Sequence, residues 1–281
     1  MAEWPNATDC KSVKPGVQIP PVAPLSSIST SMIETKNIQI VKFFLTVIFS
    51  IIGLSLYIYS GGTAFKALLI YLGFTIVSKI ANVGYHRWLA HNLLEPGPVW
   101  RVIILWSIVS TALVKPLAYV VGHRAHHKHS DTDLDPHHPG LGLWNCIIGN
   151  FNSSTYRGIP VRDIFRQKDV MFVDQHYWKL YFANLVLFCL IDVDIVLLSF
   201  LLLNLRMWLN ITVFNYIAHG GKDGRVPKNL PAWTAYVLGY AGEQLHKNHH
   251  DDPSSSNFGQ VSFFNFDVLY HVYKRFVKVK N

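Results

Sequence analysis

Clusters of histidines are the residues of this chain whose type and spacing could do chemistry. Within residues 122–129, the triplet His123, His126 and His127 has the spacing i, i+3, i+4. On a helix, this spacing puts the three rings on one face. The same spacing returns about half the chain later, and an earlier pair precedes both; these residues are His246, His249, His250, His86 and His91. The pattern predicts one metal site assembled from distant segments.

The number of these side chains narrows the kind of metal site. Six clustered imidazolium ions would repel one another, whereas neutral rings bound to a metal do not. Imidazole suits zinc, copper, iron and nickel, but one zinc takes about four ligands, so two metal ions fit the count better. A carboxylate-bridged diiron bundle needs two ExxH motifs. The sequence has four glutamates and one ExxH, from Glu243 to His246, which excludes that type.

The composition favours a membrane protein. Half of the 281 residues are apolar and only 15% are charged, which is typical of a chain with several membrane spans. The net charge of +8 comes from basic residues spread among apolar runs. Because no basic block or nucleic-acid motif occurs, we expect no nucleic-acid partner and a basic cytoplasmic face instead. Three cysteines without a CxxC argue against a disulfide framework or a zinc finger.

Four apolar stretches are predicted to cross the membrane as helices. They lie at about residues 38–60, 64–83, 174–191 and 195–217. Short turns join the first to the second and the third to the fourth, so the helices form two antiparallel hairpins. Neither turn contains Lys or Arg, whereas the segments on the other side hold most of them. By the positive-inside rule, both termini and all the histidines are cytoplasmic.

The predicted fold is therefore an all-α integral membrane protein with four transmembrane helices in two hairpins and a cytosolic helical cap that holds the metals. Residues 1–36 are rich in Pro, Ser and Thr and are predicted to be a flexible tail, and residues 37–281 to be one membrane domain. Residues 100–121 are also apolar, but Arg101, Lys115 and Pro116 interrupt them. We favour a re-entrant or surface helix there over another span, because a crossing would separate the histidines.

With these features in place, the chain resembles the membrane-bound fatty-acyl desaturases, and most closely their stearoyl-CoA (delta-9) type. The segments HRWLAH, HRAHH and HKNHH match the three histidine boxes of that family in order, and the resemblance covers about residues 38–275. It implies a ninth histidine ligand, His219, and a water-mediated contact from Asn215, which lies one helical turn earlier. It also implies that Asp131, Asp135 and Glu243 orient ligating imidazoles.

The resemblance implies an O2-dependent enzyme that introduces a double bond into a fatty-acyl chain at two iron ions. Electrons would come from a separate donor of the cytochrome b5 or ferredoxin type, and the enzyme would lie in the endoplasmic reticulum or a bacterial inner membrane. Alternatives with the same boxes are a hydroxylase, an acetylenase or an olefin-forming decarboxylase. An alternative of another class is a non-catalytic metal-binding membrane protein.

The acyl carrier stays open, because the chain departs from the stearoyl-CoA type at one place. Val121 and Gly122 stand where that type has an Arg-Asp pair that helps to hold CoA. CoA, acyl carrier protein and a membrane lipid are all compatible with the sequence. Four basic residues of the predicted cap are candidate contacts to a phosphate or an acidic carrier: Arg157, Arg162, Arg166 and Lys168.

Overall fold

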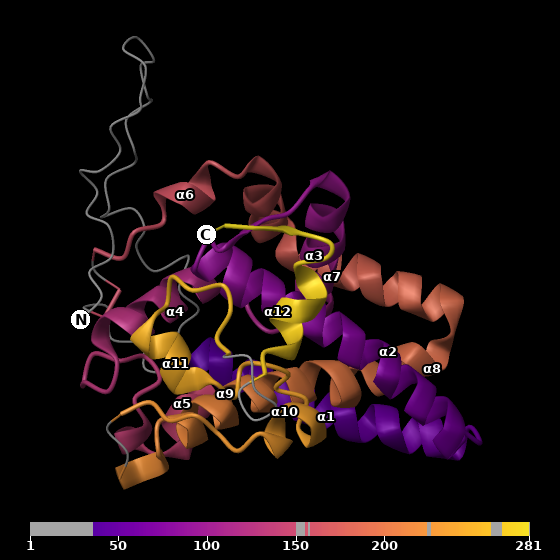
Figure 1. Cartoon of the computed structure of the whole chain (residues 1–281). Coiled ribbons are helices and arrows are strands. Elements are labelled where there is room, and N and C mark those ends of the chain that lie inside the picture. Colours follow the sequence, from indigo (N-terminus) through magenta and orange to yellow (C-terminus); the bar gives the residue numbers. More distant parts are fainter. Residues whose placement is uncertain (1–35, 150–154, 157, 224–225, 260–265, 281) are drawn as a thin grey trace.

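The computed structural model describes residues 36–149, 155–156, 158–223, 226–259 and 266–280. Apart from Lys36, the predicted tail lies outside these residues. The described chain is almost entirely helical (Figure 1), as the sequence predicted. Its only sheet among the described residues is a two-stranded antiparallel pair, β1 (Leu94–Glu95) with β2 (Lys278–Val279).

The first predicted hairpin is present as α1 (Lys36–Tyr59) and α2 (Ala64–Asn82). The turn depends on two glycines, because Gly61 has a φ of +82° and a Cβ on Gly62 would lie 2.4 Å from the Tyr57 ring. Thr63 then caps α2 by accepting a hydrogen bond from the Lys66 backbone N–H. Helix α2 continues as a π-helix, η2 (Val83–Ala90), which carries the first histidine segment.

The second hairpin consists of α7 (Lys168–Ile191) and a long helical run opposite it. That run is α8 (Val193–Ser199), the π-helical η4 (Phe200–Leu205) and α9 (Arg206–Ala218). Asp192 caps α8 by accepting from the Asp194 N–H. The two hairpins pack closely, because a Cβ on Gly53 of α1 would lie 2.0 Å from the Leu197 carbonyl oxygen of α8.

Three helical stretches in the described part of the chain are long and apolar enough to cross a membrane: Asn37–Tyr59, Ala64–Ala90 and Val193–Ala218. The protein is therefore a multi-pass membrane protein by length and composition. The third predicted span, at 174–191, lies within α7, which has 24 residues but is less apolar than these three helices. Charged side chains lower the hydropathy of its first half: Lys168, Asp169, Asp174 and Lys179.

The apolar stretch at 100–121 does not form one long helix. It is divided between α3 (Pro98–Ser110) and α4 (Pro116–His129), each with a proline at its first turn. Their lengths of 13 and 14 residues are below the roughly 20 that a membrane crossing requires. The break contains Ala112 at a φ of +48°, and Asp174 of α7 accepts a 2.8 Å hydrogen bond from the Leu117 backbone N–H just beyond it.

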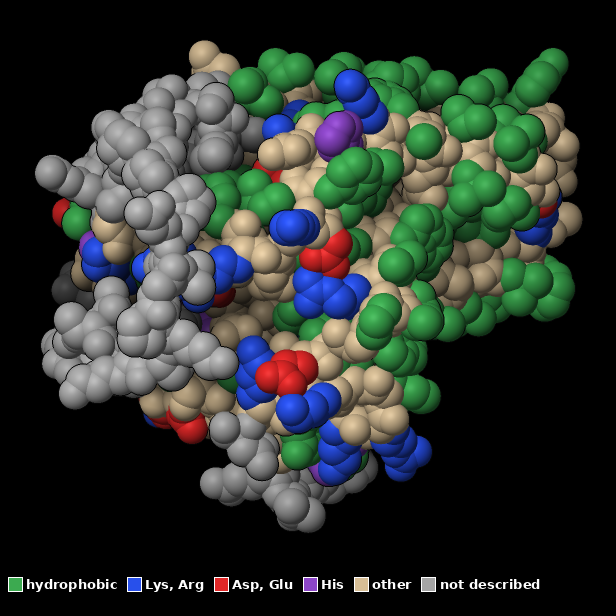
Figure 2. Space-filling model, turned by 90° about the horizontal axis from the view of Figure 1, so that it is seen from above, with side chains coloured by type: hydrophobic (Ala, Val, Ile, Leu, Met, Phe, Trp, Pro, Cys, Tyr) green, Lys and Arg blue, Asp and Glu red, His purple; other side chains and the backbone are tan. Residues whose placement is uncertain are grey.

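Short elements complete the cap around α4. They are η3 (Pro139–Leu141), α5 (Leu143–Ile148), α6 (Arg162–Phe165), η5 (Gly221–Asp223), α10 (Trp233–Val237), α11 (His246–Asp251) and α12 (Val268–Tyr273). In Figure 1 these elements gather at the end of the molecule opposite the two hairpin turns. Figure 2 shows hydrophobic side chains over the hairpin end and most of the charged ones over the cap. The molecule therefore has an apolar end, formed by the hairpins, and a charged end, formed by the cap.

Candidate metal centre

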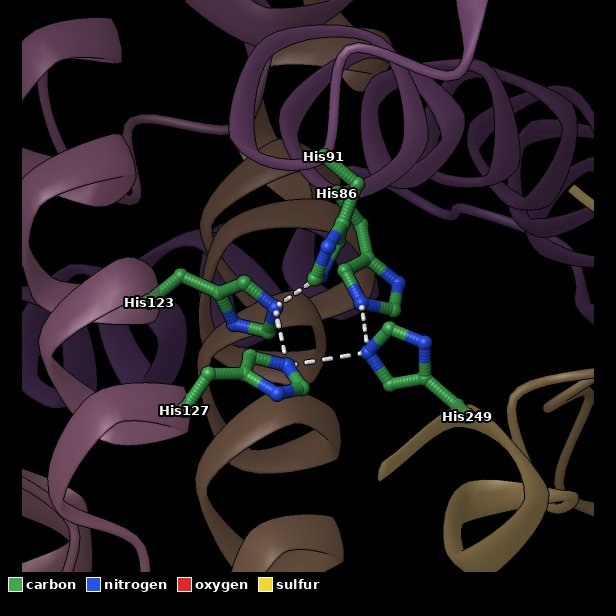
Figure 3. A group of neighbouring side chains, drawn as sticks. All are labelled: His86, His91, His123, His127 and His249. Carbon is green, nitrogen blue, oxygen red and sulfur yellow. Dashed lines mark hydrogen bonds between the residues drawn. The ribbon is translucent and has the colours of Figure 1, made fainter. Parts of the chain in front are cut away.

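Five histidines converge on one point between η2, α4 and α11 (Figure 3). We call them the first histidine group: His86, His91, His123, His127 and His249. Their Nε2 atoms face one another, at 3.0 Å between His86 and His249 and 2.8 Å between His91 and His123. The Nε2 atom of His127 lies 3.1 Å from that of His123 and 3.0 Å from that of His249.

A second histidine group lies beside the first. It consists of His126 from α4, His219 at the end of α9, and His246 and His250 from α11. The Nε2 atoms of His219 and His246 are 2.9 Å apart. The ring centroids of His126 and His250 are separated by 5.1 Å, and a ring nitrogen of each is buried without a hydrogen-bond partner.

Each histidine triplet contributes to both groups. On α4 the i, i+4 pair His123 and His127 faces the first group, and His126 faces the second. On α11 the assignment is reversed, because His246 and His250 face the second group and His249 faces the first. The two adjacent groups together contain all nine histidines that the sequence predicted for one site with two metal ions. The other five belong to neither: His129, His137, His138, His176 and His271.

Three carboxylates orient rings of these groups through the nitrogen that points away from the centre. The Nδ1 atom of His86 lies 2.7 Å from Glu243, that of His126 2.8 Å from Asp135, and that of His219 2.9 Å from Asp131. These are the three carboxylates named from the sequence. Burial alone would raise the pKa of Glu243, but His86 and Arg87 outweigh it and hold that pKa well below its usual range. An Nδ1–H that donates to a carboxylate leaves Nε2 as a lone pair aimed at the group.

The geometry of both groups fits a bound cation. Burial, and next the neighbouring histidines, lower the pKa of six of the rings, which are therefore neutral near pH 7: His91, His123, His127, His246, His249 and His250. Bare lone pairs that face each other at about 3 Å repel unless a cation lies between them. Two nitrogens that bind one ion at 2.0–2.1 Å, with an angle of about 90° between the two bonds, lie about 2.9 Å apart. The Nε2 atoms of these groups have this spacing. The groups offer five and four nitrogens, which suits a transition metal such as iron.

Two buried arginines hold the histidine segments together, and their partners could not be predicted from the sequence. Arg87 bonds Glu243 through Nη2 at 2.9 Å and Asp267 through Nη1 at 2.7 Å, which ties η2 to the C-terminal part of the chain. Arg124 donates to the carbonyl oxygens of Ala90 and Leu89, at 2.8 and 3.0 Å, and forms an ion pair with Asp163. The arginine that follows a histidine in each of the first two boxes thus has a structural contact that only the fold reveals.

A cavity of about 130 Å³ leads to the first histidine group between α1, α4, α5 and α9. Its lining includes His123, Asn215, Tyr119, Ile211, Trp208 and both Val121 and Gly122. None of its lining residues in the described chain is Lys, Arg, Asp or Glu. The predicted carrier contacts Arg162, Arg166 and Lys168 are exposed and do not line it. Arg157 lies outside the described residues.

Comparison with known proteins agrees with this geometry. The family model described as fatty acid desaturase matches residues 62–279. The sn-2 palmitoyl-lipid 9-desaturase of Nostoc sp. (strain 36) is 29% identical over 221 residues, which are 72% of this chain and 75% of that protein. The Delta-9 acyl-lipid desaturase 1 of Arabidopsis thaliana is 25% identical over 229 residues, covering 76% and 71%. An Acyl-CoA C20 Delta5-desaturase of Anemone leveillei is 23% identical over 205 residues, covering 69% and 64%. With buried histidine groups, long apolar helices and a family match over most of its length, this chain belongs to the fatty acid desaturases, which are O2-dependent oxidoreductases.

Proposed function

We propose that this desaturase holds two iron ions, one in each histidine group. The observation that carries the proposal is the division of nine histidines into groups of five and four, each with Nε2 atoms facing inward. The first group would bind one ion and the second the other. Asn215, which lines the cavity one helical turn before His219, would contact the metals through water. Glu243, Asp135 and Asp131 would fix the ring orientations.

The protein's part in the reaction is to position the acyl chain and to keep bulk water away. Two bound irons would supply, from O2 and two electrons, an oxidant able to break an unactivated C–H bond. The cavity wall formed by Val121, Ile211 and Trp208 would hold the chain with one pair of methylene groups near His123. An apolar wall selects for a hydrocarbon chain and not for a polar substrate.

We propose a membrane lipid as the acyl carrier. CoA and acyl carrier protein present phosphate or acidic groups, which proteins bind with Arg or Lys. The cavity is free of such side chains along its described lining. Beside the cavity, α5 exposes Leu143 and Trp144, and the Trp144 ring contacts Phe43 and Phe44 of α1. This apolar surface would let a lipid chain enter from the bilayer. The relatives in Nostoc and Arabidopsis are named as lipid desaturases, which supports the same choice.

We propose four membrane crossings, with α7 as the third along the chain and with both termini and the cap in the cytoplasm. Helix α7 exposes a row of large apolar side chains toward its end: Phe182, Val186, Leu187, Leu190 and Ile191. Lys66, beside the first hairpin turn, forms ion pairs with Asp192 (2.7 Å) and Asp194 in the second. The two turns therefore lie at the same end of the molecule, and a helix that runs from the cap to that end must traverse the same depth as α8 and α9. Protease protection of tags placed in the two turns would test this topology.

We also propose that electrons come from a separate protein of the cytochrome b5 or ferredoxin type. The cap exposes lysines that suit an acidic donor, among them Lys128, Lys168 and Lys278. Crosslinking of the purified enzyme to each candidate donor, followed by assay with that donor, would identify the partner. An enzyme that turns over with neither class of donor would contradict this part of the proposal.

Expression in a desaturase-deficient host with lipid profiling tests the function. We expect acyl chains lighter by two hydrogens, and two irons per chain in the purified protein. His127→Ala and His249→Ala should abolish the product, whereas His176→Ala, outside both groups, should not. A hydroxylated, acetylenic or shortened acyl chain would contradict the proposed desaturation and support a hydroxylase, an acetylenase or a decarboxylase instead. Product made by both alanine variants would contradict the metal assignment. Products confined to the CoA pool would contradict the lipid carrier.

A further inference from the structure

A second cavity reaches the histidines from another side. It has a volume of about 50 Å³ and lies between α2, α9 and residues 239–243. Its inner wall includes His86 and His123 from the first group and His246 from the second. It shares four lining residues with the apolar cavity: Tyr119, His123, Ile211 and Asn215. These four side chains therefore separate two cavities that approach the same group of rings.

The two cavities differ in chemistry. The smaller cavity has polar and charged side chains that do not line the larger one, namely Lys79 and Asn82 from α2 and Asn210 from α9, beside the apolar Met207 and Phe214. Glu243 lines it from the cap. Lys79 lies in the last turn of the otherwise largely apolar α2, and ionisable residues on membrane helices often mark proton or substrate paths. The smaller cavity is suited to water, and the larger one to hydrocarbon.

Lys79 is the cation of this cavity. Its Nζ lies 3.8 Å from the position of a Cβ on Gly239, and it forms no ion pair or hydrogen bond with any residue that the structure describes. Glu243 and Arg206 are the charged groups whose fields act on it. Arg206 is held away by hydrogen bonds of 2.8 Å to both Thr75 and Ser78 of α2. An ammonium group without protein partners must be hydrated, and a cavity of this size holds roughly three waters.

The reaction requires protons from outside the active site. A saturated –CH2–CH2– unit loses two hydrogens, O2 is reduced to two waters, and a donor supplies two electrons. The atoms balance only if two further protons enter per turnover: –CH2–CH2– + O2 + 2 e⁻ + 2 H⁺ gives –CH=CH– + 2 H2O. The apolar cavity is filled by the acyl chain during this step and offers no route for them.

We propose that the smaller cavity is the water-filled proton entry of this enzyme and that Lys79 carries protons along it. Lys79 takes a proton from water at the cytoplasmic edge of α2 and passes it to the waters beside His86 and His246. Asn82 and Asn210 hold those waters by hydrogen bonds. Protons thus arrive on one side of the rings and the acyl chain on the other. The electrons, O2 and acyl chain in this reaction rest on the proposed function.

The first test concerns water access alone, and its readout is not activity. We would place Asn210→Cys in the iron-loaded full chain with Cys10, Cys146 and Cys189 replaced by serine, reconstitute it in nanodiscs, and add a cationic methanethiosulfonate reagent. Asn210→Cys should react at least tenfold faster than Ile76→Cys. Ile76 is the matched control because it lies on α2, three residues before Lys79, and is 63% exposed on the apolar surface. Equal, slow labelling at both positions overturns the water-filled cavity.

The second test separates proton transfer from a structural role. On vesicles of phosphatidylcholine with saturated C16 and C18 chains, Lys79→Met should lower turnover about 10²-fold, within the range for lost acid–base help. Iron content should stay unchanged and the solvent isotope effect should increase. Lys79→Arg keeps the charge but does not release a proton near pH 7, so it should not restore turnover. Lys79→His should restore part of it, with a pH profile that follows an imidazole. Lys66→Met at the hairpin turn is the control.

Wild-type turnover in Lys79→Met overturns the role of Lys79, and so does full recovery in Lys79→Arg. The two tests also distinguish this proposal from the proposed function. Labelling of Asn210→Cys in a chain without desaturase activity would support the cavity while contradicting the function. Desaturase activity combined with slow labelling of Asn210→Cys would support the function while contradicting the water-filled cavity.

Discussion

The Glu243→Gln substitution removes one negative charge beside the first histidine group without changing the shape of the side chain. Glu243 lies 2.7 Å from His86 Nδ1 and accepts hydrogen bonds from Nε and Nη2 of Arg87, at 3.2 and 2.9 Å. A glutamine oxygen can still accept from His86, so the ring keeps its direction. The imidazole loses the carboxylate that makes it a stronger ligand. Arg87 remains paired with Asp267 at 2.7 Å, so we expect the fold to survive.

Loss of a hydrogen-bonded partner of this kind typically lowers metal affinity or activity about 10- to 100-fold, or about 1.4 to 2.7 kcal/mol. We expect a loss of this size in iron affinity, measured by competition with chelators of graded strength on purified protein. The yield of unsaturated lipid in the expression host should fall in parallel. Circular dichroism and the thermal midpoint of the metal-free protein should change little.

Two matched variants make the result specific. Asp131→Asn removes the negative charge of the carboxylate that lies 2.9 Å from His219, so it should weaken the iron of the second group by a similar factor and leave that of the first. Glu95→Gln removes a carboxylate that pairs with Lys278 on the surface and should change neither iron nor product. Wild-type iron affinity and product in Glu243→Gln would refute the claim that this carboxylate supports a metal-binding ring.

Three further substitutions or conditions test the packing and the charge state of the site. Gly242→Ala should lower the thermal midpoint by the equivalent of about 2–4 kcal/mol, because its φ is +131° and a Cβ would lie 2.1 Å from Asp267 Oδ1; a midpoint equal to wild type would contradict the close approach. Gly53→Ala should cost about 1–3 kcal/mol by pushing α1 away from the Leu197 carbonyl oxygen, and a matched Gly73→Ala, with open space around it, should cost much less. The metal-free protein should be less stable at pH 5.5 than at pH 7.5. Burial lowers the pKa of most of the clustered histidines in the folded protein, whereas a histidine of the unfolded chain has a pKa of about 6.5. Below that pH the unfolded chain therefore binds more protons than the folded one. The folded state loses up to roughly 1.4 kcal/mol of stability per pH unit and ring as the pH falls. A thermal midpoint that rises on acidification would show that the sign is wrong.

Local sequence signals predicted those parts of the structure that depend on neighbouring residues. The glycine pair before Thr63 determines the first turn, and the continuous apolar pattern after it determines α2 and its extension through His86. The proline at position 116 separates α3 from α4, as the interrupted pattern at 100–121 indicated. In α7, the apolar second half favours the predicted span at 174–191, whereas charged side chains occupy the first half. Length and apolar content alone do not decide whether such a helix crosses.

The division of the histidines into two groups could not be predicted from spacing. Residues at i+3 and i+4 lie about 100° apart around a helix, which is enough to point His126 and His127 into different groups. Which of them joins which group depends on how α4 meets α11, a contact between residues more than 100 positions apart. The same holds for Arg87, whose partners Glu243 and Asp267 follow it by 156 and 180 residues. Spacing predicted the candidate histidines as a set, and tertiary packing distributes them between two groups.

The proposed ligand set also explains why the carboxylates lie one layer further out. In the proposed site, nine neutral imidazoles would leave the charge of two divalent ions uncompensated inside an apolar protein, where an unbalanced charge is expensive. Glu243, Asp135 and Asp131 supply negative charge through His86, His126 and His219 without occupying a coordination position themselves. They are divided between the groups, one behind the first and two behind the second. The second group has four histidines and the first has five, so the group with fewer rings has more carboxylates behind it. Asp135→Asn should therefore weaken iron binding in the second group without releasing the iron of the first group.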